Sequence, residues 1–347
     1  MMASLSRLRL ASPEGVGLLL LAAYAAYGLF WLGSIDERDR LFFYEVTLSG
    51  LLAGVMYSLV ALGFVLIFKS SGIFNFSQGV MALFAGLFLT GFMNDFGVPA
   101  FLAIPLTVAV MVAVAFAVER FVLRHLVNQE PIILFMATIG LAFVLEGVGD
   151  ILWGSDVKPL DVGLPRGASD FLLDGYGLYV EKLEIAAAAV AAVLVVALSL
   201  FSQYTRIGRA LRAVADDHQA ALSVGISLRT IWVIVWSIAG AVALVAGIMW
   251  GSKSGVQFSL ALIALKALPV LILGGFTSIP GAILGGLIIG VGEKWAEIYL
   301  GEVMNALFGL NASWFTAIEN WFAYVLALAF LLVRPQGLFG EKIIERV

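Results

Sequence analysis

The sequence predicts an all-α membrane protein, a polytopic bundle of about ten transmembrane helices. Three observations predict this class: 62% of the 347 residues are apolar, only 13% are charged, and the mean hydropathy is +1.03. Globular domains carry roughly 45–50% apolar and about 25% charged residues, so this chain has too few polar side chains to cover a surface in water. A water-soluble enzyme is therefore excluded.

The rest of the composition excludes further classes of chemistry. The chain has no cysteine and only 2 histidines, so thiol nucleophiles, disulfides and zinc or iron clusters are not expected. The formal net charge of −4 is too small and too mixed in sign to indicate nucleic-acid binding. We therefore expect no metal site and no catalytic residue.

Apolar stretches close to the bilayer-crossing length of about 20 residues recur along the chain. Eight are regular, at residues 15–33, 46–68, 98–118, 131–153, 183–201, 230–250, 258–276 and 314–333. Two are irregular, since residues 79–93 are too short to span alone and residues 279–299 are rich in glycine. The first stretch is longer than the apolar part of a signal peptide, which predicts an uncleaved anchor. The distribution of Lys and Arg in the short loops predicts that both termini are cytoplasmic.

The longest inner loop, residues 202–229, has the pattern of an amphipathic helix. Leu211, Val214 and Leu222 recur at helical spacing, and charged side chains occupy the other face. Gly225 is expected to end the helix. Such a helix needs a partner surface, and the composition leaves two open: anionic lipid and another protein.

Four segments resemble a known family. QAALSVG, residues 219–225, is similar to the EAA-x-x-x-G coupling signature of ABC importer permeases, with Gln219 where glutamate is usual. SGIFNFSQG (71–79), LGGFTSIPGAILGG (273–286) and RPQGLFGE (334–341) resemble further segments of the branched-chain amino-acid (Liv-type) permeases of ABC importers, LivH-like more than LivM-like. The sequence departs from that family at Gln78 and Val80, where His and Glu are usual.

The resemblance implies a domain layout and a function. Residues 1–45 are an extension with the first transmembrane helix, residues 46–341 are the permease domain with its coupling loop at 202–229, and residues 342–347 are a tail. The implied function is that of the permease subunit of an ATP-driven importer in the bacterial inner membrane, with branched-chain or related amino acids as cargo. Urea, short amides and aromatic acids are alternative cargoes, and an autonomous ion-coupled carrier is an alternative class.

The resemblance also implies partners. The chain lacks the G-x-x-x-x-G-K-S/T phosphate-binding motif, so no cofactor is expected on it, and ATP and Mg²⁺ are expected on two separate cytosolic ATPase subunits. A second, LivM-like permease or another copy of this chain, and a periplasmic solute-binding protein, complete the implied assembly. The residues expected to couple to the ATPases are Arg209, Arg212, Asp216, Asp217, Gln219, Ala220, Ala221 and Gly225. The four charged members are also compatible with a solvated helix face.

Ionisable and polar groups inside the spans are the candidates for the translocation pathway. Ionisable residues in a membrane usually face a bundle interior or water, which selects Lys266, Glu146 and Asp150, although an internal ion pair is also open. In addition, residues 71–77 and 254–259 resemble each other and fall at opposite membrane faces by the charge pattern. Such an inverted repeat with interrupted helices would mark a substrate route, and chance similarity is the alternative. The route residues would be Asn75, Ser77 and Gln78 at one end and Gln257 and Ser259 at the other.

A glycine-rich run predicts a close helix contact. The glycines at positions 281, 285, 286 and 290 fall at four-residue spacing, which brings small residues onto one helix face. We therefore expect Gly281, Gly285, Gly286 and Gly290 to pack against another span, in either a static or a sliding contact.

Overall fold

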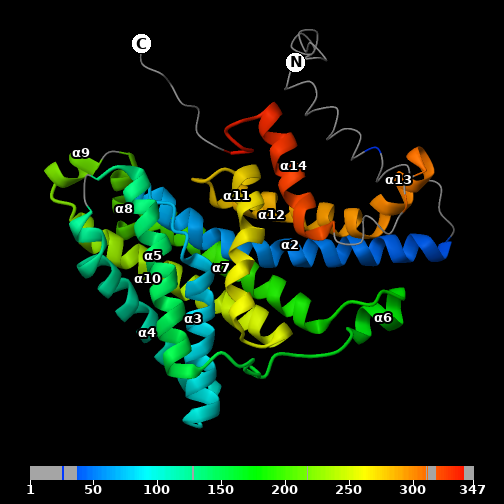
Figure 1. Cartoon of the computed structure of the whole chain (residues 1–347), viewed down its shortest axis with the longest axis horizontal. Helices are drawn as coiled ribbons and strands as arrows, with labels where there is room; N and C mark the ends of the chain where they lie inside the picture. Colours follow the sequence, from blue (N-terminus) through cyan, green and yellow to red (C-terminus); the bar gives the residue numbers. More distant parts are fainter. Residues whose placement is uncertain are drawn as a thin grey trace, which may run out of the picture. The chain divides into compact units, whose positions relative to one another are not determined.

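A computed structural model describes residues 26, 37–126, 129–216, 218–309, 311 and 318–339, and its regular elements there are helical (Figure 1). The longer helices are α2 (Glu37–Ser71), α3 (Gln78–Thr90), α4 (Ala100–Phe121), α5 (Pro131–Trp153), α7 (Lys182–Tyr204), α8 (Arg206–Asp216), α10 (Leu228–Ser254), α11 (Ile263–Gly274), α12 (Ile279–Trp295) and α14 (Glu319–Val333). The shorter elements are η2 (Gly91–Asp95), η3 (Leu123–His125), α6 (Asp170–Tyr176), α9 (His218–Ser223), η4 (Phe258–Leu262), η5 (Ala296–Leu300) and α13 (Gly301–Phe308). Extended pairing over these residues is limited to two isolated bridges, Lys158–Val256 and Ala168–Glu181. The all-α prediction is confirmed.

The predicted number of about ten spans is not confirmed. Among the described residues, five helices are long and apolar enough to cross a membrane, namely α2, α4, α5, α7 and α10. A sixth span is possible by length if two helical stretches, 258–274 and 279–308, count as one, but they are bent by 114° at the break between them. The helices α3 and α14 have only 13 and 15 residues, short of the about 20 that a bilayer requires. The predicted span at 15–33 lies outside the described residues except at position 26.

The chain divides into two compact units. The first unit comprises residues 1–55, 166–185 and 268–347, and the second unit comprises residues 56–165 and 186–267. The helices α2, α7 and α11 therefore each contribute residues to both units.

The second unit is built around α3 and α10. The helix α10 packs against α3 and α4, and α3 also packs against α5 and η4 (Figure 1). Glycines allow close contacts between these helices: a Cβ added to Gly247 of α10 would lie 2.5 Å from the carbonyl oxygen of Ala82. Almost every side chain of α3 is buried, as expected for a short apolar helix at the centre of a bundle.

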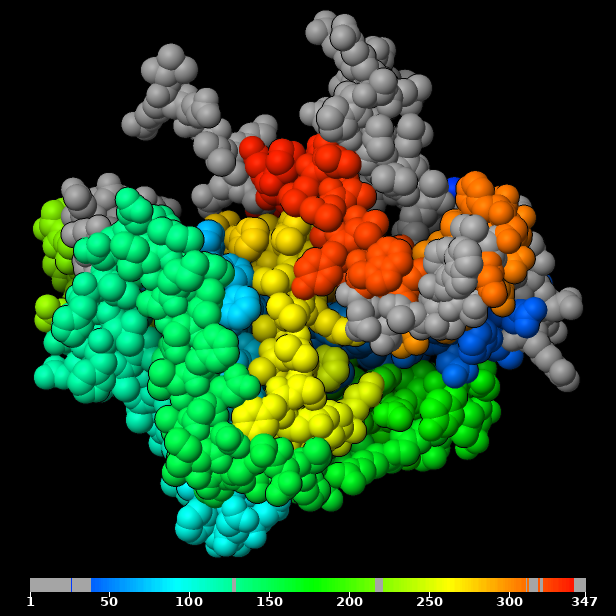
Figure 2. Space-filling model, in the orientation of Figure 1, coloured from blue at the N-terminus to red at the C-terminus, as the bar shows by residue number. Residues whose placement is uncertain are grey.

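The outer helices of the second unit expose large apolar side chains. Phe101 of α4, Phe143 of α5 and Val193 of α7 are 72%, 71% and 69% exposed. Figure 2 shows the side chains of α5 on the surface along this face of the unit. Apolar side chains at such positions would be unfavourable in water but not in a lipid bilayer.

In the first unit, α12 packs against η5 and α14. The first part of α2 is anchored by an aromatic cluster, in which Phe43 and Tyr299 are buried and Trp295 packs against them. The Trp295 Nε1–H group donates a hydrogen bond to Thr47 Oγ1 at 2.9 Å. This contact satisfies the polar atom of a large apolar side chain, as tryptophan requires when it packs in an interior.

Candidate functional site

Two helices of the second unit stop in the same way. The helix α2 ends at Ser71 and is followed by Gly72 with φ +68°, and α10 ends at Ser254 and is followed by Gly255 with φ +78°. In both cases the glycine N–H donates to the carbonyl four residues earlier, at 2.8 Å. A positive φ is readily adopted by glycine, which explains why both similar segments carry Gly after Ser. The two segments matched in sequence therefore share their local geometry at the break.

The first break, between α2 and α3, contains a buried polar cluster made of Asn75, Ser77 and Gln78. Their side chains are 0%, 0% and 1% exposed. Ser77 Oγ donates to Asn75 Oδ1 at 2.6 Å, and Asn75 Nδ2 donates to Gln78 Oε1 at 3.3 Å. Gln78 Nε2 in turn donates to the carbonyl oxygen of Ala239, within α10, at 3.2 Å. The three predicted route residues thus form one hydrogen-bonded group that ties the start of α3 to α10.

Residues distant in sequence hold this cluster in place. A Cβ on Gly63 of α2 would overlap the side-chain amide of Gln78, so glycine makes the room for it. The Thr138 hydroxyl of α5 accepts a hydrogen bond from Phe76 N–H at 3.0 Å and lies 3.1 Å from the carbonyl oxygen of Phe74. Sequence reasoning missed Gly63, Thr138 and Ala239, since no local pattern links them to the break.

The second break, between α10 and η4, is arranged differently. Gln257 is half-buried and precedes η4, whereas Ser259 is exposed. The backbone of Val256 holds this break in place, because it pairs with the backbone of Lys158 through hydrogen bonds of 2.8 and 2.9 Å. The two breaks do meet at one point, because a Cβ on Gly79 would lie 2.6 Å from Cβ of Ala264. The start of α3 and the start of α11 are therefore in close contact.

Lys266 lies on α11 with a half-buried side chain. Its Nζ atom is 5.7 Å from the centre of the Tyr57 ring, and Tyr57 stacks on Trp250 with ring centres 5.9 Å apart. The attraction between an ammonium group and an aromatic face is worth about 0.5–2 kcal/mol, more when desolvated. The sequence pattern gave no indication of this aromatic neighbour. On α5, Glu146 is half-buried and Asp150, one turn on, is exposed.

The predicted coupling loop begins with a tightly bonded corner between α7 and α8. Thr205 Oγ1 accepts from Gly208 N–H at 2.9 Å, and a Cβ on Gly208 would overlap the last carbonyls of α7. The Arg212 guanidinium donates to the carbonyl of Ser202, and Arg209 Nη1 donates to that of the last residue of α7 at 3.3 Å. Helix ends leave such carbonyls without intrahelical partners. The two arginines predicted to meet an ATPase therefore bind the end of α7 in this structure.

Gly225 ends the last helix of this loop, α9, as the sequence predicts. Gly225 has φ +84°, its N–H donates to the carbonyl of Leu222 at 3.0 Å, and Ile226 N–H donates to that of Ala221 at 3.0 Å. This pair of bonds is the Schellman motif of helix C-termini. Ala221 is buried, whereas Leu222 and Val224 are 52% and 74% exposed. Asp217 and the side chains of Asp216, Gln219 and Ala220 lie outside the described part of the chain.

The glycine-rich run of α12 makes two close contacts within the first unit. A Cβ on Gly290 would lie 2.5 Å from Cα of Gly54 in α2, and Gly54 also meets Gly286. On the other contact, a Cβ on Gly285 would lie 2.6 Å from the carbonyl oxygen of Val270, and Gly281 meets the end of α11. The four glycines thus lie where α12 approaches α2 and α11 backbone to backbone.

Two of the four family-like segments come together at the end of α11. Leu338 N–H and Phe339 N–H, from the segment 334–341, donate to the carbonyls of Leu273 and Gly274 at 2.8 and 3.2 Å. These carbonyls open the segment 273–286, in which Ser278 caps α12. The chain after α14 therefore supplies hydrogen-bond donors to the last carbonyl groups of α11.

The chain is similar to known transport proteins over most of its length. The family described as branched-chain amino acid transport system / permease component matches residues 46–334. The high-affinity branched-chain amino acid transport system permease protein LivH of Salmonella typhimurium is 27% identical over an alignment of 325 residues that covers 90% of this chain and 100% of that protein. The corresponding permease protein BraD of Pseudomonas aeruginosa is 28% identical over 86% of this chain and 96% of its own length. A probable branched-chain amino acid transport permease protein LivH of Methanocaldococcus jannaschii is 28% identical over 81% of this chain and 88% of its own.

Proposed function

This chain belongs to the family of branched-chain amino acid transport permease components, and on that premise we propose that it is the membrane-spanning subunit of an ATP-driven importer for branched-chain or related amino acids. The family match confirms the resemblance that four short segments predicted. It also makes the chain a multi-pass membrane permease, in agreement with its apolar helices.

The proposal has three further parts. ATP and Mg²⁺ bind to two separate cytosolic ATPase subunits, since this sequence contains no phosphate-binding motif of its own. A related permease or a second copy of this chain, and a periplasmic solute-binding protein, complete the assembly in a bacterial inner membrane. The observation that carries the proposal is the family match over residues 46–334.

We propose that the segment from α8 to Gly225 receives the movement of the ATPases. The bonds of Arg209 and Arg212 to the end of α7 support this role, because a helix joined rigidly to a span passes its displacement on to that span. The exposed side chains of Leu222 and Val224 at the other end of the segment offer apolar area to a partner.

The test is leucine uptake by the complete assembly in proteoliposomes. We expect uptake to require ATP, the ATPases and the binding protein, to stop with vanadate, and to persist with a protonophore. Uptake by this chain alone, or uptake that collapses with the protonophore at constant ATP, would instead favour an ion-coupled carrier.

The proposed orientation has a separate test, because the chain has no native cysteine. The exposed positions Gln203 and Val224 should label as cysteines only from the cytosolic side, and Asp156 only from the periplasmic side. Labelling of all three from one side would overturn the assignment of the loops.

A further inference from the structure

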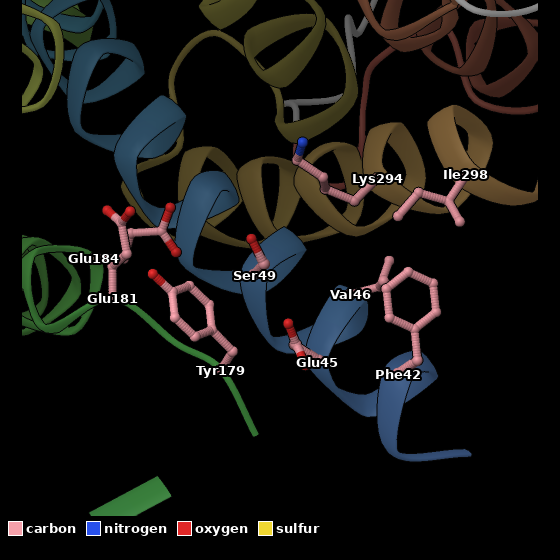
Figure 3. A pocket seen from close by; sticks show the side chains of 9 residues that line it. All are labelled: Phe42, Glu45, Val46, Ser49, Tyr179, Glu181, Glu184, Lys294 and Ile298. Atoms are coloured by element: carbon pink, nitrogen blue, oxygen red, sulfur yellow. The ribbon is translucent and has the colours of Figure 1, made fainter. Parts of the chain in front are cut away.

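A pocket of about 290 Å³ opens in the first unit (Figure 3). Three carboxylates line it, those of Glu45 on α2 and of Glu181 and Glu184 near the start of α7. Lys294 of α12 lines it as well, so both signs of charge are present. Pockets that bind small molecules have volumes of about 300–1,000 Å³. This pocket is at the lower end of that range, so it has room for one small solute and not for a peptide.

Two of the three carboxylates lie apart from the apolar groups of the pocket, whereas Glu45 is next to Val46 on α2 (Figure 3). Figure 3 shows the carboxylates of Glu181 and Glu184 on one side, and Phe42, Val46 and Ile298 on the opposite side. A ligand that fits this arrangement carries a positive group at one end and an apolar group at the other.

The carboxylates do not form a metal site. Over the residues that the structure describes, no group of three or more His, Asp or Glu side chains is close enough to hold a metal ion. Three glutamates that line one pocket without converging on a point suit an organic ammonium group, which takes hydrogen bonds from separate directions.

Lys294 supplies the complementary charge. Its Nζ atom donates to Glu297 Oε2 at 2.6 Å, and its side chain is 30% exposed. An ammonium group has three donor hydrogens, so a lysine side chain can bond to more than one carboxylate at the same time.

We propose that this pocket binds one free α-amino acid with an apolar side chain, as a zwitterion. Its ammonium group lies toward Glu181 and Glu184, its carboxylate is held by Lys294, and its side chain packs on Val46 and Ile298. The inference rests on the proposed function for the class of cargo. The pocket includes residues of the loop predicted to face outside, which makes it a receiving site for solute on that side of the membrane.

The experiment measures binding of tritiated L-leucine to the full chain in nanodiscs, without ATPases or binding protein. We expect saturable binding that falls at least about tenfold, or 1.4 kcal/mol, in E181Q/E184Q and in K294M. Glu302→Gln, an exposed acidic residue on α13, is the matched control and should leave binding unchanged. Circular dichroism and size-exclusion chromatography of each variant report whether it is folded.

Competing ligands test each part of the zwitterion. Leucinamide lacks the carboxylate, 4-methylpentanoate lacks the ammonium group, and glycine lacks the apolar side chain, so each should compete at least about tenfold more weakly than leucine. Isopentylamine competing as well as leucine would overturn the proposal in favour of a site for any cation, such as a basic side chain of a partner. Absence of leucine binding, or equal binding by the folded variants, would also overturn it. Loss of ATP-driven uptake with leucine binding retained would count against the proposed function instead.

Discussion

Replacing Gly54 with alanine tests the backbone contact between α2 and α12. The added Cβ would lie 2.9 Å from Cα of Leu287 and closer still to the carbonyl oxygen of Gly286, whereas ordinary contact begins at 3.4 Å. The obstructing atoms belong to the backbone, so one helix must move away from the other. Overpacking of this kind lowers the free energy of unfolding by about 1–3 kcal/mol. The preference of helices for alanine over glycine, about 0.5–1 kcal/mol, offsets part of that cost.

The matched control is Gly140→Ala on α5, where an added Cβ meets no atom within 4 Å. This variant has only the helix preference of alanine and should be more stable than the wild type by about 0.5–1 kcal/mol. The helix preference is common to both variants, so Gly54→Ala should be less stable than Gly140→Ala by about 1–3 kcal/mol, measured as the unfolding transition in mixed detergent micelles. If Gly54→Ala proved as stable as Gly140→Ala, α2 and α12 would not be in backbone contact.

Three other predictions concern the corner, the outer loop and the polar cluster. Arg212→Gln removes the cap of α7, so the complete assembly should hydrolyse ATP with several-fold less leucine imported per ATP, whereas Arg206→Gln, exposed on the same helix, should keep that ratio. Lys182 lowers the pKa of Asp170 through a hydrogen bond of 2.7 Å and through its charge. The stability that this pair adds to α6 is complete above the usual pKa of an aspartate and is lost as pH falls through the lowered pKa; carboxyl NMR titration should show the pKa rise in Lys182→Met. Gln78→Leu leaves the carbonyl of Ala239 without its side-chain donor and should cost about 1–3 kcal/mol in the same unfolding assay; no loss would show that the bond contributes nothing.

Helices with a simple apolar pattern could be predicted closely. The stretch 131–153 was predicted as a span and is the helix α5, Pro131–Trp153. Its start follows from Pro131, which favours the first turn of a helix, and its end from Gly154 with φ +73°. Here local sequence and bilayer thickness give the same answer, so no tertiary information was needed.

The start of α2 could not be predicted from hydropathy. The helix already includes Glu37, nine residues before the predicted span at Val46. The added residues include Glu and Arg, which favour helix formation but are charged. A search for apolar stretches therefore does not include them in a span. Their packing depends on a residue that is distant in sequence, because Phe43 contacts Trp295 with ring centres 5.2 Å apart.

Of the two helices that meet at the glycine contact, only α12 could be identified from the sequence. The four-residue spacing in α12 identified its glycines, but the partner residues Gly50 and Gly54 have no pattern that names α12 as their neighbour. A helix face can be read from one sequence segment, whereas the pairing of two faces depends on how the chain folds.

The polar cluster shows what a sequence alone leaves undecided about a route. Polar residues within an apolar chain predicted Asn75, Ser77 and Gln78 as route residues, and the structure finds them buried and bonded to one another. Side chains in this arrangement have no surface to offer a passing solute. A route lined by them therefore requires a second conformation, in which the side chain of Gln78 leaves the carbonyl of Ala239. Breaking one such buried bond costs about 1–3 kcal/mol, which is within the range that binding at a distant site supplies to a conformational equilibrium.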